Sequence, residues 1–270
     1  MYLKKFYLYS AVSIAIFYLL TSLYMYVFQR SFLYLPNINN HLRSTTLNVA
    51  AERLEIASAE GITLKSWSYQ NPANTYTVLF FHGNAGDLDN RIYKLNEFKN
   101  LGLNYLIISW RGFSGNKGYP TEAGLYEDAR SAISWLEKNN VPKNKIILYG
   151  ESLGTGVAVE VAQKQNLAGV ILESPYTSMV DTAKISYPYL PVNLILKDKY
   201  KSIDKIKNIT APILIMHGGS DIIVPISMGQ RMFKQAPSKK YSYFPAHEGH
   251  MMKYTPRLKQ TLEDFVASLD

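Results

Sequence analysis

The sequence predicts a single α/β domain with a mostly parallel β-sheet, preceded by one membrane-spanning helix. Residues Phe6 to Phe28 carry no charge, no Pro and no Gly. Beyond residue 50, short apolar runs typical of buried strands alternate with amphipathic helical runs. One strand-to-helix junction carries Gly-x-Ser-x-Gly, at Gly150–Gly154. Alternating strands and helices form right-handed βαβ crossovers, which give parallel strands with helices on both faces of the sheet.

The composition is that of one folded domain with a terminal segment. The chain has 270 residues, 47% of them hydrophobic, and no cysteine. The lack of cysteine excludes a disulfide framework, a thiolate metal site and a cysteine nucleophile. The formal net charge is +8, but the lysines are scattered, and no Arg-rich strip with interleaved aromatics indicates base readout. We therefore expect no nucleic-acid partner and interpret the charge as a solvated basic surface or, alternatively, as one facing an anionic membrane.

The apolar run predicts a single N-terminal membrane anchor within residues 1–30. At about 1.5 Å per helical residue, Phe6–Phe28 is long enough to cross a hydrocarbon core of ~30 Å. Tyrosines near both ends resemble the aromatic belts of membrane interfaces. A cleaved signal peptide is the alternative, but the run is longer than a usual signal-peptide core, and no small-x-small cleavage site follows it.

Charges beside the run predict the orientation of the anchor. Lys4, Lys5 and the terminal amine precede it, and Arg30 and Arg43 follow it. By the positive-inside rule, we expect the N-terminus in the cytoplasm and the folded domain on the extracytoplasmic side of a single-pass membrane protein.

After a polar linker (residues 31–50), the domain is expected to span residues 51–270. Alternating runs at Leu54–Ala57 and Ile62–Tyr69 predict antiparallel edge strands. Antiparallel strands followed by parallel ones are the order of an α/β-hydrolase sheet, which is eight-stranded. Further strands are expected at Thr77–Phe81, Tyr105–Ser109, Lys145–Tyr149, Val170–Leu172, Pro212–Met216 and Tyr241–Phe244, and helices at Asp89–Leu101, Thr121–Asn139, Ile226–Gln235 and Pro256–Leu269.

The segment 175–209 interrupts the alternation of strands and helices. It is rich in Tyr, Pro and branched apolar residues and lies where sheets of this kind carry an insertion. We expect a small cap there that covers the active site and shapes the substrate pocket.

The junction at Gly150–Gly154 predicts the nucleophile. The apolar run Ile146–Tyr149 ends at Gly150, and a helical pattern begins after Leu153. Gly-x-Ser-x-Gly at such a junction is typical of a nucleophile elbow, in which the serine has strained backbone geometry and lies at a helix N-terminus. The glycines avoid clashes between a Cβ atom and the neighbouring strand or helix. Ser152 is therefore the candidate nucleophile.

A serine needs a base and an orienting acid, which in this fold follow it along the chain in the order acid, then histidine. Asp221 follows the strand Pro212–Met216, and His250 lies in the loop before the last helix. Two alternatives stay open from the residues alone: Glu173 as the acid and His247 as the base. The pair His247-x-x-His250 also resembles metal ligands, but no third ligand completes a motif, so we expect no metal site.

The tetrahedral intermediate requires two N–H donors. One is expected from Leu153, directly after the nucleophile. The other is expected from the loop His82–Gly86, where the Asn84 amide is the first candidate and the Ala85 amide the second. A purely structural polar turn is the alternative for this loop.

These motifs together resemble the Bem46-like (ABHD13-like) branch of the α/β-hydrolase superfamily of serine hydrolases. The resemblance covers nearly the whole chain and implies the triad Ser152, Asp221 and His250, no cofactor, and hydrolysis of an ester, thioester or similar acyl bond. The segments that carry it are Phe32–Pro36, Phe81–Gly86, Trp110–Gly115, Pro120–Glu122, Gly150–Gly154, Glu173–Ser178, His217–Gly218 with Asp221 and Val224–Pro225, and His250.

The resulting hypothesis is a membrane-anchored serine hydrolase that cleaves an ester or thioester acyl bond through an acyl-enzyme. Its expected partners are a small-molecule or acylated substrate and the membrane that holds the N-terminal helix. Two alternatives remain: a peptidase or amidase with the same triad, and a non-catalytic, membrane-tethered module with this fold.

Overall fold

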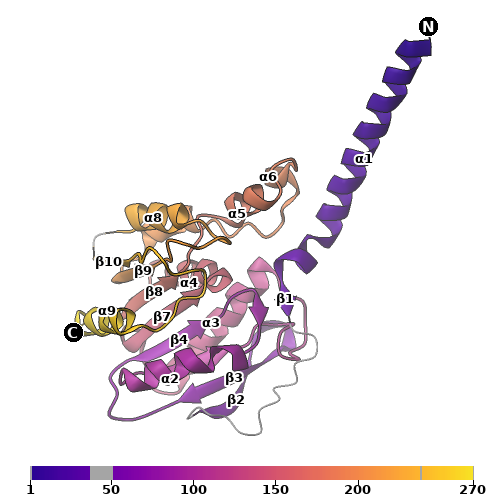
Figure 1. Ribbon diagram of the computed structural model, residues 1–270. Coiled ribbons are helices and arrows are strands. Elements are labelled where there is room, and N and C mark those ends of the chain that lie inside the picture. Colours follow the sequence, from indigo (N-terminus) through magenta and orange to yellow (C-terminus); the bar gives the residue numbers. More distant parts are fainter. Residues whose placement is uncertain (1, 37–50, 238, 270) are drawn as a thin grey trace.

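Within residues 2–36, 51–237 and 239–269, which the computed structural model describes, eight strands form one mostly parallel sheet (Figure 1). The strands are β2 (Glu52–Ala57), β3 (Thr63–Tyr69), β4 (Thr77–Phe81), β6 (Asn104–Ile108), β7 (Ile146–Glu151), β8 (Gly169–Glu173), β9 (Ile213–Met216) and β10 (Lys240–Tyr243). Their spatial order is β10-β9-β8-β7-β4-β6-β3-β2. Strand β3 pairs antiparallel with both β2 and β6, and all other pairs are parallel. The predicted sheet is confirmed.

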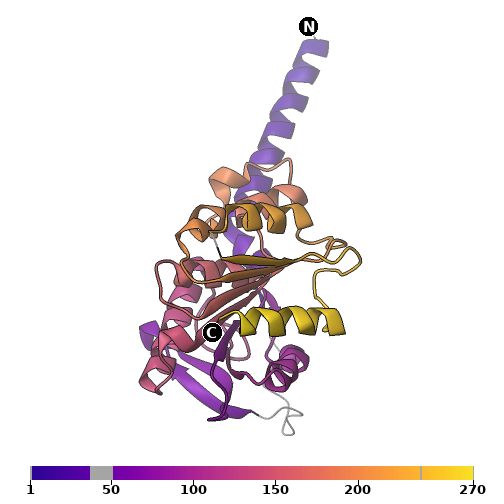
Figure 2. The same ribbon diagram turned by 90° about the vertical axis from the view of Figure 1, so that its left-hand side faces the viewer.

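Helices cover both faces of this sheet. They are α2 (Ile92–Asn100), α3 (Glu122–Lys138), α4 (Leu153–Ala162), α8 (Ile226–Gln235) and α9 (Pro256–Ala267). One core contains apolar side chains of α3, α4 and α8, and the other contains those of α2 and α9. Strand β4 contributes to both, because its alternate residues point to opposite faces: Leu79 and Phe81 to the first core, Val78 and Phe80 to the second. Figures 1 and 2 show this three-layer arrangement.

The boundaries of these elements lie within about two residues of the expected ones, except at the start of α2. The helix expected from Asp89 begins with a 3-10 turn, Asp89–Arg91, and is α-helical only from Ile92. Arg91 has non-helical angles (φ −108°, ψ 1°), and its guanidinium reaches the buried Glu151. Arg91 thus lies at the junction between the 3-10 turn and the regular helix, where its side chain pairs with Glu151.

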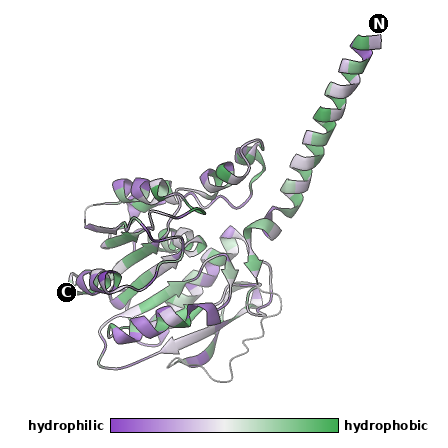
Figure 3. Ribbon diagram, viewed as in Figure 1, coloured by the Kyte–Doolittle hydropathy of each residue, from purple (hydrophilic) through white to green (hydrophobic). Residues whose placement is uncertain are grey.

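The N-terminal helix α1 (Tyr2–Leu33) projects away from the domain (Figures 1 and 2). It is long and apolar enough to cross a membrane, and its most apolar window is not buried by the rest of the protein. Figure 3 shows it green or pale along most of its length. The helix continues beyond residue 30, where the anchor was expected to end.

The chain that leaves α1 pairs with the domain at once. Strand β1 (Leu35–Pro36) forms a parallel ladder with β5 (Ala85–Gly86), within the loop expected to bind the oxyanion. The amide of Leu35 donates to the Asn84 carbonyl at 2.8 Å. The division into anchor (1–30), linker (31–50) and hydrolase domain (51–270) stays a prediction, and linker residues 37–50 lie outside the described residues.

Between β8 and β9, the segment expected as a cap contains three short helices. They are α5 (Met179–Ser186), α6 (Val192–Ile195) and α7 (Ser202–Lys205). Helices α5 and α6 lie beside the C-terminal part of α1 in both ribbon views (Figures 1 and 2). Arg30 of α1 forms an ion pair with Asp198 of the cap at 2.8 Å, and the hydroxyls of Tyr34 and Tyr200 are 2.9 Å apart. The helix therefore has specific contacts with the cap.

Candidate active site

Ser152 lies at a strained turn between β7 and α4. Its backbone angles, φ 50° and ψ −115°, lie outside the usual regions for a residue with a side chain. A Cβ at Gly150 would lie 2.6 Å from the Thr155 Cα, and one at Gly154 would lie 2.0 Å from the Phe81 carbonyl oxygen. Both glycines are therefore required sterically, as the elbow motif predicts. The tight turn places the Ser152 side chain at the N-terminus of α4, in an open cleft.

The structure brings Ser152, His250 and Asp221 into one hydrogen-bonded row. His250 Nε2 lies 2.9 Å from Ser152 Oγ, and His250 Nδ1 lies 2.7 Å from Asp221 Oδ2. A carboxylate only accepts hydrogen bonds, so Nδ1 carries the proton and Nε2 is left to accept from the serine hydroxyl. The His250 side chain is 13% exposed and that of Asp221 fully buried. This geometry enables His250 to act as a base towards Ser152.

Asp221 is held in place from several directions. Its Oδ1 accepts from the backbone amides of Ile223 and Val224, and its Oδ2 also lies 3.2 Å from His217 Nε2. Burial alone would raise the pKa of the Asp221 carboxyl, but hydrogen bonds from His217, His250 and the Val224 amide together hold it well below its usual range. Asp221 is therefore an anion positioned to orient and stabilise the His250 imidazole.

His217 was not singled out for a role at the site by the sequence reasoning. It is fully buried at the end of β9, and its Nε2 also lies 2.8 Å from the Val224 carbonyl. Gly229 of α8 leaves room for its ring, since a Cβ there would lie 2.4 Å from Nδ1. The spacing His217-x-x-x-Asp221 directly after an apolar strand was the available signal.

The alternatives to the triad lie elsewhere. The Glu173 carboxylate bonds Lys94, Tyr149 and the Met252 amide. His247 is exposed. Both ring nitrogens of His250 have partners in the triad, and among the described residues no group of three His, Cys, Asp or Glu side chains is arranged to hold a metal ion.

The candidate oxyanion donors flank the nucleophile. Leu153 is buried as the first residue of α4. The loop with Asn84 passes beside Ser152, since a Cβ on Gly83 would lie 3.6 Å from the Ser152 Cβ. The Asn84 side chain donates to the Leu33 carbonyl at 3.0 Å, so the end of α1 directly holds this loop. The donor roles of the Leu153 and Asn84 amides stay predictions.

A buried ionic network lies directly beneath the cleft and was not predicted. Lys94 of α2, fully buried, bonds Glu151 at 2.7 Å and also bonds Glu173, and Arg91 bonds Glu151 at 2.6 Å. Burial opposes both charges, yet the two carboxylates raise the pKa of Lys94, while Lys94 and Arg91 lower that of Glu151. Lys94 and Glu151 are thus both held in their charged forms.

This network joins the loops that meet at Ser152. Glu151 precedes Ser152 and accepts from the Gly83 amide at 3.3 Å, and the Glu173 carbonyl accepts from the Ser152 amide at 2.9 Å. The Glu173 carboxylate accepts from Met252, two residues after His250. Ser152 and the loop that carries His250 are thereby held from below by buried charged groups.

The cleft above Ser152 has a volume of about 380 Å³, within the range of small-molecule sites. Its walls combine the loop around Asn84 with Ser152, His250 and the apolar side chains of Ile223 and Met251. A small molecule of moderate size therefore has access to Ser152.

Comparisons with known proteins agree with the fold. Residues 76–195 match the family model described as alpha/beta hydrolase fold. An uncharacterized protein of Mycobacterium tuberculosis is 35% identical over 80% of this chain and 79% of its own length. Protein bem46 of Schizosaccharomyces pombe is 31% identical over 83% and 79%, respectively. Lysophosphatidylserine lipase ABHD12 of Xenopus tropicalis is 29% identical over 78% of this chain and 63% of its own length.

Solved structures share the fold. An esterase of Pyrococcus furiosus superposes with a TM-score of 0.70, at 19% sequence identity, and covers 87% of this chain and 98% of its own. The elbow, the sheet order and the family match lead to one conclusion. This chain belongs to the α/β-hydrolase superfamily, in its Bem46-like branch.

Proposed function

We propose that the protein is a membrane-anchored serine hydrolase that cleaves an ester or thioester acyl bond. The observation that carries the proposal is the row from Ser152 Oγ through His250 to Asp221, with distances of 2.9 and 2.7 Å. The relative named lysophosphatidylserine lipase supports ester hydrolysis.

In the first half-reaction, Ser152 Oγ attacks the acyl carbon and His250 Nε2 takes the hydroxyl proton. Asp221 stabilises the resulting imidazolium through Nδ1. The amides of Leu153 and Asn84 donate to the oxyanion. When the intermediate collapses, His250 returns the proton to the leaving alcohol or thiol, which departs and leaves the acyl group on Ser152.

In the second half-reaction, water enters the cleft and His250 takes one of its protons. The hydroxide attacks the acyl carbon, and collapse of the second intermediate returns the proton to Ser152 Oγ and releases the carboxylic acid.

The membrane location is also a proposal. Helix α1 is interpreted as a single-pass anchor, and Lys4 and Lys5 before its apolar run favour an extracytoplasmic domain. In intact cells, externally added protease should then digest the domain. Digestion only after cell lysis would place it in the cytoplasm.

Ser152→Ala tests the catalytic proposal on the full-length chain in detergent. Loss of the nucleophile should lower kcat for p-nitrophenyl butyrate by at least about 10³-fold at an unchanged melting temperature. Ser131→Ala on α3 is a control remote from the cleft and should retain activity. Undiminished hydrolysis by folded Ser152→Ala would refute the proposal.

A further inference from the structure

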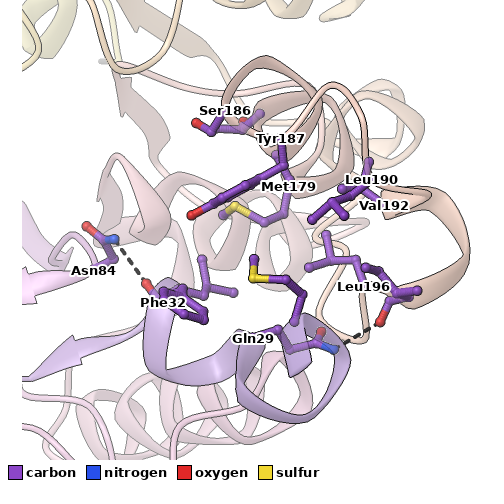
Figure 4. Close-up of a pocket in the computed structure, with 14 residues that line it drawn as sticks. Gln29, Phe32, Asn84, Met179, Ser186, Tyr187, Leu190, Val192 and Leu196 are labelled. Atoms are coloured by element: carbon purple, nitrogen blue, oxygen red, sulfur yellow. Dashed lines mark hydrogen bonds between the residues drawn. The ribbon is translucent and has the colours of Figure 1, made fainter. Parts of the chain in front are cut away.

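An apolar pocket of about 230 Å³ lies between the C-terminal part of α1 and the cap (Figure 4). Gln29 and Phe32 of α1 lie on one side, and Met179 and Tyr187 of the cap on the other. The helix interpreted as an anchor thus forms one wall of a cavity. The aliphatic lining comes from α1 (Met25, Leu33) and from the cap (Met179, Leu190, Val192, Ile195).

The one amide that α1 contributes to this lining is fully engaged. Gln29 Nε2 donates to the carbonyls of Tyr26 and Ile195 at 2.8 and 2.9 Å, and its Oε1 accepts from the Lys197 amide at 2.6 Å. Gln29 therefore fastens α1 to the cap. Because its polar atoms are already satisfied, the α1 wall suits a hydrocarbon ligand.

The pocket adjoins the catalytic cleft at Asn84, which lines both cavities. Asn84 is held from the α1 side by its bond to the Leu33 carbonyl. A chain-like ligand in the pocket therefore has its near end beside Asn84, in the same loop that passes Ser152.

The tip of the cap has the composition of a membrane-inserted segment. Residues 185–196 carry no charge and are flanked by Lys184 and Lys197. Tyr189 and Leu194 in this segment are 88% and 83% exposed, respectively. Large exposed apolar side chains bounded by lysines are typical of segments that enter the lipid interface.

The position of this tip along α1 places it at membrane depth. The Tyr18 hydroxyl donates to the Tyr189 carbonyl at 3.0 Å. A core of ~30 Å needs about 20 helical residues, so a span beginning at Phe6 ends near Met25. Tyr18 then lies about 10 Å inside that boundary, at 1.5 Å per residue. The bond from Tyr18 also satisfies a backbone carbonyl that lipid could not.

We propose that the pocket between α1 and the cap binds the acyl chain of a bilayer lipid ester, and that the cap tip (residues 185–196) enters the same leaflet. The lipid moves from the bilayer along α1 into the pocket, with its ester beside Ser152. The anchor is thus part of the substrate site. The inference rests on the proposed function for the chemistry, but the insertion of the tip can be measured independently.

Insertion is tested with single-cysteine labels, since the chain contains no cysteine. Full-length Leu194→Cys and Gln260→Cys, the latter exposed on α9, are labelled with an NBD fluorophore in phosphatidylcholine vesicles. Lipids brominated on their acyl chains should quench the NBD fluorescence at position 194 and leave the fluorescence at position 260 unchanged. Equal quenching at both positions would overturn the insertion.

Acyl binding is tested by the ratio of kcat/KM for p-nitrophenyl palmitate to that for the butyrate. Phe32→Ala should lower this ratio about tenfold, because it removes a wall of the pocket. Phe17→Ala, on an exposed part of the same helix, is the matched control and should leave the ratio unchanged. Ala183→Phe, which fills the pocket from the cap, should lower the ratio by at least as much.

The outcomes separate the two proposals. An unchanged ratio in both pocket variants, with Ser152-dependent hydrolysis of butyrate intact, overturns the acyl site and leaves the hydrolase standing. If Ser152→Ala hydrolyses both esters as fast as the parent chain does, the hydrolase proposal is overturned. The quenching result still decides the position of the cap tip.

Discussion

Asp221 accepts hydrogen bonds from two imidazoles and two backbone amides, and only one of these contacts was implied by the sequence. The sequence predicted Asp221 and His250 because, in this fold class, the acid and then the histidine follow the serine along the chain. It did not predict the contact between His217 and Asp221, because that contact depends on how the loop after β9 folds back. The sequence leaves Glu173 as an alternative acid for the same reason, whereas in the structure its carboxylate bonds Lys94, Tyr149 and the Met252 amide.

Replacing the Asp221 carboxylate by an amide should therefore lower the rate of hydrolysis strongly. Asp221→Asn removes the charge that orients His250 and should lower kcat for p-nitrophenyl butyrate by about 10³–10⁴-fold. Glu173→Gln should lower kcat far less, because Glu173 bonds the Met252 amide and does not bond the His250 ring. The reverse order of the two effects would contradict the assignment of Asp221.

His82, buried beside Trp110, predicts a pH dependence of stability. Burial, together with the Arg91 cation, lowers its pKa to about 3. Below about pH 6.5 the unfolded chain therefore binds a proton on this imidazole that the folded chain does not. The free energy of unfolding should fall by up to about 1.4 kcal/mol per pH unit from this residue as pH drops from 6.5 towards 3. The free energy of unfolding, measured in urea at a series of pH values, should fall less steeply with decreasing pH in His82→Gln than in the parent chain. An equal pH dependence in the two proteins would refute the assignment of this effect to His82.

At the scale of elements, α2 carries the feature least visible in the sequence. Its pattern correctly predicted an amphipathic helix, and Lys94 lies in its apolar register, four residues before the buried Phe98. A lone lysine in such a position is usually solvated at its tip. Here Glu151 and Glu173, at the ends of two adjacent buried strands, supply the compensating charges. Pairing between distant segments of this kind is not encoded in local periodicity.

Breaking this network should destabilise the domain strongly. Lys94→Met leaves two buried carboxylates short of a cation and should lower the free energy of unfolding by about 3–5 kcal/mol. Lys259→Met on α9 removes a partly exposed ion pair with Glu97 and should cost less than about 1 kcal/mol. Chemical unfolding of both variants in detergent gives the comparison. Equal losses of unfolding free energy in the two variants would show that the buried network stabilises the domain no more than the partly exposed ion pair does.

At the scale of the whole molecule, the sequence predicted an anchor, a domain and a cap as separate parts. The structure joins them: β1 pairs with the loop at Ala85–Gly86, and Arg30 pairs with Asp198 of the cap. These contacts involve residues assigned to anchor and linker, whose composition shows only that they are apolar or polar. The contacts that fix α1 to the domain and to the cap therefore could not be predicted from the sequence.

The apolar helix, rather than the net charge of +8, should hold the protein on membranes. Full-length protein reconstituted into phosphatidylcholine–phosphatidylglycerol vesicles should float with them in molar salt, because screening weakens charge attraction and leaves apolar burial intact. Release by salt would show that binding is electrostatic and that α1 does not span the bilayer.

The most direct test of the central claim is labelling of the full-length chain with a fluorophosphonate, followed by mass spectrometry to locate the adduct. An activated nucleophile predicts one adduct, on Ser152, that is lost in His250→Ala while the variant stays folded. Full-length protein is needed because α1 holds the loop that contains Asn84. A folded parent chain that stays unlabelled at Ser152, or a His250→Ala variant that labels equally fast, would contradict the account.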